Sequence, residues 1–291
     1  MSNTRIEERK YVSKYIDVDH AKMHYIEAGQ GDVILFLHGV PTSSFVWRNI
    51  IPHLSSIGHC IAPDLMGFGF SDKPEIQYTI DEHVHYINQF IQTLGLKKVI
   101  LVMHGWGSVI GFHYAMNHEK NCRGLIFYEA FLQPADEEFS LPLAEQLSLL
   151  NTSENKATMS GVSLVDKMIS QAAMQQLNTD VLNAYRQPFK EEGTAQPILQ
   201  YLNELSEKNK AKINKLIANY SKKLTHSNLP KLMLYSVPGF ITSIASVMWA
   251  KENLSHLEMI DIGEELHLAQ ESYPALMGET MSVWLQGLER L

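Results

Sequence analysis

The sequence predicts an α/β protein with a mostly parallel sheet that helices cover on both faces. Two observations lead to this prediction. Short runs rich in β-branched and other apolar residues recur along the chain, and amphipathic stretches with helical periodicity separate them. Uninterrupted apolar runs are typical of strands buried on both faces, as in a parallel sheet. We therefore expect a doubly wound arrangement of strands and helices.

The expected elements follow in chain order. Alternating apolar and polar residues at 12–17 and 23–27 predict an N-terminal hairpin. The buried strands are expected at 33–37, 59–62, 99–103, 124–128, 231–235 and 257–262, with helices at 80–94 and 109–117 among them. Together these runs predict an eight-stranded sheet flanked by helices.

A long stretch without strand-like runs separates the sixth and seventh buried segments. Residues 132–225 are rich in Leu, Met, Gln and Glu and are broken by Pro and Gly, which predicts a helical cap domain inserted after the sixth strand. Residues 1–131 and 226–291 are then the core domain. Open α/β sheets bind ligands at the carboxyl ends of their strands, where we expect the cap. Candidate pocket residues, for which packing in the core is an equal alternative, are Tyr185, Phe189, Met159, Met168, Met174 and Leu266.

Composition narrows the class of function. With 291 residues and 45% hydrophobic content, the chain has room for one large core and an inserted subdomain. Its net charge of −8 disfavours nucleic acid and anionic membrane as partners. We see no apolar leader and no run long enough to cross a bilayer, so we expect a cytoplasmic protein. Cys60 and Cys122 lie in apolar surroundings and are expected to be buried thiols, and we expect neither a metal nor a cofactor.

A strand followed directly by small residues and a helix indicates a nucleophile elbow. The run 99–103 leads into the segment His-Gly-Trp-Gly-Ser at 104–108, and a helical pattern follows. Small residues permit the sharp turn, which exposes the middle side chain above the sheet and places the next N–H at a helix N-terminus. Hydrolases carry Ser, Cys or Asp at the middle position, whereas this chain carries Gly105.

A histidine and an acid are the next candidates for the site. His267 follows the last predicted strand, where hydrolases of this chain order place their catalytic histidine. Such a histidine needs a carboxylate to hold its tautomer, but the segment after residue 235 contains none nearby. Glu129, at the end of the run 124–128 and between apolar neighbours, is the remaining candidate. A structural histidine and a solvated glutamate are the alternative interpretations.

Two main-chain groups are expected to form an oxyanion hole. The strand 33–37 enters His38-Gly39-Val40, and the N–H of Val40 is expected to act together with the N–H of Trp106. Because both donors belong to the main chain, side-chain replacements do not remove them. The glycine-punctuated loop at 64–74 lacks the Gly-Lys-Ser/Thr ending of a phosphate loop and is interpreted as a structural turn.

With these residues in view, the sequence resembles the haloalkane dehalogenases of the α/β-hydrolase superfamily. The resemblance is to the subgroup in which the acid follows the sixth strand, a subgroup that includes a marine luciferase. It extends over nearly the whole chain. The segments that carry it are HGVPTSSFVWRNIIPHL at 38–54, APDLMGFGFSDKP at 62–74, HGWGS at 104–108, YRQPF at 185–189 and DIGEELHLAQE at 261–271.

The resemblance implies a specific chemistry and a departure from it. The family uses an Asp nucleophile that displaces halide to form an ester, which His-activated water hydrolyses, while a Trp N–H and an Asn amide hold the halide. Trp106, Glu129 and His267 match this set, but Gly105 stands at the nucleophile position and Val40 at that of the halide-binding Asn. Without a side chain at position 105, no alkyl-enzyme ester can form.

Three hypotheses remain open at this point. In the first, His267 oriented by Glu129 acts as a general base on a small apolar substrate, or on a water above Gly105, in non-covalent chemistry of lyase, cyclase or hydrolytic type. The second is a non-catalytic homologue that binds a small apolar ligand. The third is a haloalkane dehalogenase or epoxide hydrolase whose nucleophile has been replaced. The second loss, at Val40, favours a natural change of role.

Overall fold

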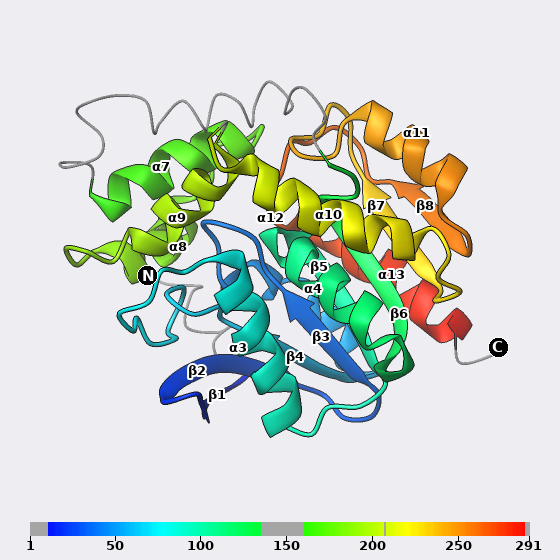
Figure 1. The fold of residues 1–291 in the computed structure, drawn as a ribbon, viewed down its shortest axis with the longest axis horizontal. Helices are drawn as coiled ribbons and strands as arrows, with labels where there is room; N and C mark the ends of the chain where they lie inside the picture. Colours follow the sequence, from blue (N-terminus) through cyan, green and yellow to red (C-terminus); the bar gives the residue numbers. More distant parts are fainter. Residues whose placement is uncertain (1–10, 135–159, 207, 289–291) are drawn as a thin grey trace.

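A single sheet of eight strands forms the centre of the molecule in the computed structural model, which describes residues 11–134, 160–206 and 208–288. The strand order is β1-β2-β4-β3-β5-β6-β7-β8 (Figure 1). Strand β2 is antiparallel to both of its neighbours, and every other neighbouring pair is parallel. The predicted mostly parallel eight-stranded sheet is therefore confirmed.

Every strand lies where an apolar or alternating run predicts one. The strands are β1 (Val12–Val18), β2 (Ala21–Ala28), β3 (Val33–Leu37), β4 (His59–Pro63), β5 (Val99–Gly105), β6 (Cys122–Ala130), β7 (Lys231–Tyr235) and β8 (Leu257–Asp261). Strands β5 and β6 continue two residues beyond the predicted ends, to Gly105 and Ala130. The polar residues His104 and Glu129 interrupt the apolar runs there, so the pattern stopped short of the true carboxyl ends.

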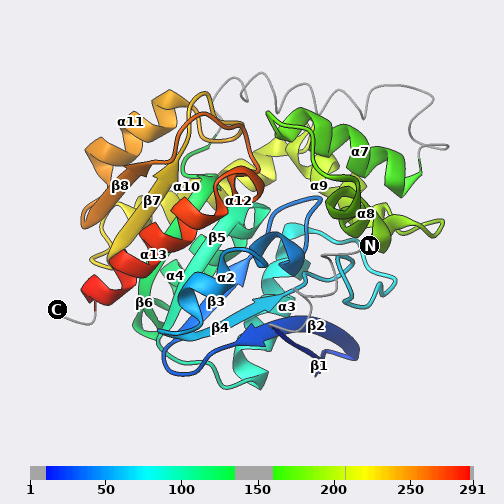
Figure 2. The same cartoon turned by 180° about the vertical axis from the view of Figure 1, so that it is seen from behind.

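Helices cover both faces of the sheet, as Figures 1 and 2 show from opposite sides. The face seen in Figure 1 carries α3 (Ile80–Thr93) and α4 (Trp106–Asn117), and the reverse face carries α2 (Ile51–Leu54) and α13 (Pro274–Leu288). A capping box between Thr79 and Glu82 begins α3. The remaining elements of the core are η1 (Ser44–Trp47), η2 (Glu119–Asn121), α11 (Ile244–Asn253) and α12 (Ala269–Ser272).

The described residues between β6 and β7 are helical. They form α7 (Gly161–Ala172), α8 (Thr179–Arg186), η3 (Gln187–Phe189), α9 (Gln196–Leu205) and α10 (Lys210–Leu224), which we call the insertion helices. In both views α7, α8 and α9 lie beyond one end of the sheet, while α10 packs along α4 (Figures 1 and 2). The division into a core and a cap domain at residues 132 and 225 stays a prediction.

Buried ionic contacts hold the insertion helices against the core. Arg48 donates to both carboxylate oxygens of Glu271, at 2.7 and 2.6 Å, and Tyr185 of α8 donates to the same carboxylate. On the other side, the carboxylate of Glu204 in α9 accepts from the N–H of Ile80, the first residue of α3, at 3.0 Å. The Arg48–Glu271 pair with Tyr185, and the hydrogen bond of Glu204, therefore join the insertion helices to the core at two places.

Two further expectations can be compared with the structure. Cys60 and Cys122 are both buried free thiols, which confirms the interpretation of these residues. Among the residues that the structure describes, no helix combines the length and apolar character needed to span a bilayer.

Candidate functional site

The turn between β5 and α4 has the geometry of a nucleophile elbow, with glycine at its tip. Gly105 has φ of 52° and ψ of −125°, a conformation that side chains other than hydrogen rarely adopt. It is the last residue of β5, and Trp106 is the first residue of α4. The N–H of Trp106 thus belongs to the first turn of a helix, where N–H groups have no partner within the helix.

The imidazole of His267 lies directly against Gly105. A Cβ atom built on Gly105 would lie 3.2 Å from both Cε1 and Nε2 of His267, closer than ordinary van der Waals contact. The side chain of His267 therefore lies directly beside the position that the first side-chain atom of a nucleophile would occupy.

Glu129 holds the other nitrogen of the same ring. Its Oε2 lies 3.1 Å from Nδ1 of His267. The carboxylate also accepts main-chain N–H groups from Phe240, Ile241 and Thr242, at 3.0, 2.5 and 3.3 Å. Glu129 is only 1% exposed and has a positive φ of 50°, an uncommon backbone conformation for glutamate. The fold therefore orients this carboxylate with several donors and aims it at His267.

Burial shifts the pKa of both partners. It lowers the pKa of His267 to about 3, an effect that the nearby Glu265 opposes. It raises the pKa of Glu129 to about 8, and the three main-chain donors oppose that shift. Around neutral pH the imidazole is therefore neutral. When Glu129 is ionised, Nδ1 of His267 carries the proton and donates it, so the free lone pair is on Nε2, beside Gly105.

The loop that carries His267 is bound to the insertion. The N–H of His267 donates to the carbonyl oxygen of Ala172, the last residue of α7, at 2.8 Å. Oε1 of Glu265 accepts from the N–H groups of Met174 and Leu266, both at 2.9 Å. These links could not be predicted from the sequence. A main-chain carbonyl has no sequence signature, and a glutamate in a loop, such as Glu265, is usually a solvent-exposed residue.

A second histidine supports the first from the sheet side. The rings of His104 and His267 are 4.2 Å apart, and Nε2 of His104 donates to the carbonyl oxygen of His267 at 2.9 Å. Tyr128 stacks on His104 with an interplanar angle of 10° and donates to the carbonyl oxygen of Leu266. Burial holds the pKa of His104 well below its ordinary value, so this support is a neutral ring.

The residues predicted for the oxyanion hole lie beside Gly105. The Cα atom of Gly39 is 3.3 Å from the Cβ position of Gly105, so the loop before Val40 abuts the elbow. Val40 and Trp106 are buried. The N–H of Val40 donates no hydrogen bond within residues 11–134, 160–206 and 208–288. The main chain at Gly39, directly before Val40, and at Trp106 therefore lies close to the tip of the elbow.

Aromatic side chains enclose the site. Trp106 packs edge-to-face against Tyr201 of α9, with ring centroids 5.1 Å apart, and against Phe131 at 6.0 Å. The ring of Phe240 lies 5.3 Å from that of His267. Tyr201 and Phe240 were not among the residues predicted for the pocket, because a single aromatic residue in an apolar stretch is indistinguishable from core packing.

The predicted pocket residues have different locations. Phe189 and Met168 are buried, and Leu266 is half-buried directly before His267. Tyr185 is buried but binds Glu271, as described above. Met174 is 51% exposed and lines a surface groove of about 560 Å³ beside α7 and α8, and its main-chain N–H donates to Glu265. Met159 lies outside the described residues.

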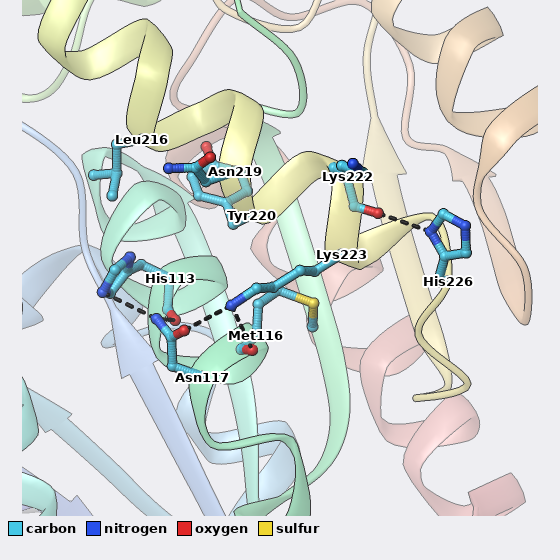
Figure 3. A pocket seen from close by; sticks show the side chains of 9 residues that line it. All are labelled: His113, Met116, Asn117, Leu216, Asn219, Tyr220, Lys222, Lys223 and His226. Carbon is cyan, nitrogen blue, oxygen red and sulfur yellow. Dashed lines mark hydrogen bonds between the residues drawn. The ribbon is translucent and has the colours of Figure 1, made fainter.

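A basic groove of about 530 Å³ lies elsewhere on the surface, between α4 and α10 (Figure 3). His113, Lys222, Lys223 and His226 are among the residues that line it. Nζ of Lys223 donates to Oδ1 of Asn117, the last residue of α4, at 2.8 Å. A cation at a helix C-terminus stabilises that helix, so these contacts join α10 to α4. The groove contains none of the residues around Gly105.

The arrangement around Gly105 provides an oriented neutral base, an acid that holds it and two main-chain donors, inside aromatic walls. Among the described residues, no group of three or more His, Cys, Asp or Glu side chains gathers as metal ligands would. The side chains that the structure brings together at Gly105 are a histidine and a carboxylate, groups that can transfer protons.

Comparison with known proteins gives the family. The α/β hydrolase fold family matches residues 32–270. A haloalkane dehalogenase of Mesorhizobium japonicum is 34% identical over 278 residues, which cover 93% of this chain and 90% of that protein. One of Bradyrhizobium diazoefficiens is 32% identical over 287 residues, with 92% of each chain covered. The crystal structure of haloalkane dehalogenase DbeA from Bradyrhizobium elkani USDA94 has a TM-score of 0.90 at 30% identity and covers 96% of this chain and 99% of its own. The chain therefore belongs to the α/β-hydrolase family, among the haloalkane dehalogenases.

Proposed function

We propose that this protein is an enzyme that has exchanged covalent catalysis for acid–base catalysis by the His267/Glu129 dyad, acting on a small apolar substrate. One observation carries the proposal: Nε2 of His267 lies 3.2 Å from the position that Cβ of a nucleophile would occupy. The reactive lone pair of the histidine is therefore beside the place where the reactive carboxylate of a dehalogenase would begin.

The proton chemistry follows from the two partners. Neutral His267 removes a proton from the substrate, or from a water that attacks it, and Glu129 stabilises the imidazolium that forms. The imidazolium then returns the proton to the product. No bond between enzyme and substrate is formed, which is compatible with lyase, cyclase or hydrolytic steps. The N–H groups of Val40 and Trp106 stabilise negative charge that develops on a substrate oxygen.

The walls of the site favour an apolar substrate with a single polar atom. Trp106, Tyr201 and Phe240 supply aromatic surface, which is typical of small-molecule pockets. The indole N–H of Trp106 and the hydroxyl of Tyr201 are each able to donate to a polar substrate atom that enters the site.

Val40 supports this proposal over an ordinary dehalogenase. An Asn at that position would supply the second N–H to the leaving halide, and valine cannot donate any hydrogen bond from its side chain. Two independent requirements of dehalogenation are therefore absent from one site. The buried His267 and Glu129, in contrast, remain hydrogen-bonded to each other.

The experiment that tests the proposal compares three proteins: the wild type, His267→Ala, and His85→Ala as a matched control with a half-exposed histidine far along the chain. Each is incubated with small-molecule extract from the source organism, and compounds are followed by untargeted mass spectrometry. We expect products with the wild type and the control that do not form with His267→Ala. Compounds retained unchanged by all three would show a ligand-binding protein, and halide release by the wild type would contradict the loss of covalent chemistry.

A further inference from the structure

The N-terminal hairpin and the loop after β4 bring together a serine, a histidine and an aspartate. Oγ of Ser13 lies 2.8 Å from Nε2 of His24, and Nδ1 of the same ring lies 2.7 Å from Oδ2 of Asp64. Ser13 is on β1, His24 is on β2 and Asp64 follows β4. In the sheet, β1, β2 and β4 form one edge, and β3 lies between them and β5, which ends at Gly105 (Figures 1 and 2). Ser13 and His24 therefore lie at the edge of the sheet, away from Gly105.

The aspartate is held in one orientation. Asp64 is fully buried, and its two oxygens also accept the N–H groups of Ser44 and Phe70, at 2.7 and 2.8 Å. Gly69 lets the loop wrap closely around it, since a Cβ there would lie 2.0 Å from Asp64. Burial raises the pKa of Asp64, but the contacts with His24, His38 and the Phe70 N–H outweigh this and lower it overall.

The hydrogen bonds determine the protonation of the histidine. An ionised Asp64 can only accept, so Nδ1 of His24 carries a proton and donates it. In the neutral ring Nε2 is then an acceptor, and the hydroxyl of Ser13 donates to it. A serine that donates to a histidine whose other nitrogen donates to a buried aspartate is the ground state of nucleophilic serine catalysis.

The serine is accessible, and apolar surface surrounds it. Ser13 is exposed, whereas His24 is only 2% exposed. The rings of Tyr15 and Phe70 lie 5.1 and 5.2 Å from that of His24, and these two residues are 57% and 65% exposed. Exposed aromatic side chains beside a polar group are a surface on which an apolar molecule can bind.

The edge of the sheet provides a main-chain donor at the serine. The N–H groups of Lys22 and His24 donate to Asp72 and Ser71, away from β1. His24 and its cross-strand partner Tyr15 are therefore a non-hydrogen-bonded pair, as are the next alternate residues, Ile26 and Ser13. The N–H of Ser13 consequently points outward from β1, the outermost strand of the sheet, toward the position of an incoming carbonyl oxygen.

We propose that Ser13, His24 and Asp64 form a second nucleophilic centre that accepts the acyl group of small esters with apolar or aromatic substituents. Oγ of Ser13 attacks the ester carbonyl while Nε2 of His24 takes its proton. The bond to the leaving oxygen breaks, and His24 protonates the departing alkoxide to the alcohol. Water, deprotonated by His24, then attacks the acyl-serine, releases the carboxylic acid and restores Ser13. The sum is ester plus water giving acid plus alcohol.

A serine-directed fluorophosphonate tests the nucleophile directly. The full-length protein is incubated with the reagent, and peptide mass spectrometry locates the phosphonate. We expect modification of Ser13, its loss in Ser13→Ala, and at least a 100-fold slower reaction in His24→Gln, which preserves a side chain that can hydrogen-bond Asp64. Ser170→Ala, which removes an exposed serine bonded only to a main-chain carbonyl, is the matched control and should be modified as the wild type is.

Two further measurements complete the test. His267→Ala should be modified at Ser13 at the wild-type rate, because the two sites are separate. The wild type should also hydrolyse 4-nitrophenyl butyrate at a rate that Ser13→Ala lowers and Ser170→Ala preserves. Ser13→Ala removes the hydroxyl that donates to the buried ring of His24, so it should melt somewhat below the wild type, and circular dichroism at the assay temperature should show that the variant is folded. No modification of Ser13, or modification no faster than that of Ser170, would overturn the proposal.

Discussion

The main-chain N–H of His267 donates to the carbonyl oxygen of Ala172, 2.8 Å away, so the last residue of α7 holds the candidate base in place. A second link runs from the carboxylate of Glu265 to the N–H of Met174. Because the two links flank the same loop, displacement of α7 from the core would also displace the imidazole. The position of the base is therefore coupled to the seating of the insertion helices.

Replacing Glu265 should loosen this coupling. Glu265→Ala removes the acceptor of the partly buried N–H groups of Met174 and Leu266, at a cost of roughly 0.5–1.5 kcal/mol for each. We expect faster amide hydrogen exchange in peptides that contain Met174 and His267, measured by mass spectrometry. The exposed neighbour Glu264→Ala is the control and should exchange as the wild type does. Equal protection in the two variants would show that Glu265 does not anchor the loop.

Turnover should depend on the ionisation of Glu129. Its pKa is raised to about 8 by burial, and only the ionised form accepts the Nδ1 proton of His267 and leaves Nε2 as the base. The turnover rate of the substrate that mass spectrometry identifies should therefore rise with pH and level off above about pH 8. Glu129→Gln should lose on the order of 10³- to 10⁴-fold, because an amide can hold the wrong tautomer. A flat profile, or an active Glu129→Gln, would exclude Glu129 from this role.

Glu204 should make stability depend on pH. Burial raises its folded-state pKa from 4.5 to about 7, while the N–H of Ile80 and Lys212 oppose the shift and Asp81 adds to it. A raised folded-state pKa means that the fold prefers the protonated carboxyl. Its stabilising contribution is complete below about pH 4.5 and is lost as the pH rises through about 7. The difference between the folded-state pKa of about 7 and the ordinary value of 4.5 limits this contribution to the free energy of unfolding to about 3 kcal/mol.

Thermal melting over this pH range measures the effect. Glu204→Gln removes the titrating group, so its melting temperature should fall less between about pH 5 and pH 8 than that of the wild type. Glu192→Gln, an exposed position, is the control and should follow the wild type. If all three proteins show parallel profiles, the carboxyl of Glu204 does not titrate in this range.

Restoring the nucleophile alone should not restore dehalogenation. Aspartate at position 105 meets the ring of His267 at 3.2 Å and adopts a φ of 52°, which costs about 1–2 kcal/mol. The single variant Gly105→Asp also lacks the side-chain N–H that an Asn at position 40 would donate to the halide. A hydrogen bond to a charged group of this kind contributes roughly 1.5–3 kcal/mol. We expect bromide release from 1-bromobutane to be at least about 10-fold faster for Gly105→Asp/Val40→Asn than for Gly105→Asp. Rapid release by the single variant would mean that the chain lacks only its nucleophile.

The fold could be predicted from the sequence because an uninterrupted apolar run indicates a strand that is buried on both faces. Every predicted strand is present, several with ends that differ by one or two residues, and β5 and β6 were predicted to end too early because His104 and Glu129 break the apolar pattern there. Gly105, Glu129 and His267 were expected near one another because the carboxyl ends of parallel strands share one edge of a sheet. The close approach of His267 to Gly105 was not predictable, because it depends on side-chain position and on a main-chain bond to Ala172.

The glycine at the elbow also has an evolutionary consequence. Removing a side chain at position 105 needs no other adjustment, since it only creates space. The reverse step must push back a ring whose main chain is bonded to Ala172 and whose Nδ1 is bonded to Glu129. The two directions of this substitution therefore differ in cost, because a side chain at position 105 requires the ring of His267 to yield by a few tenths of an ångström, whereas glycine does not.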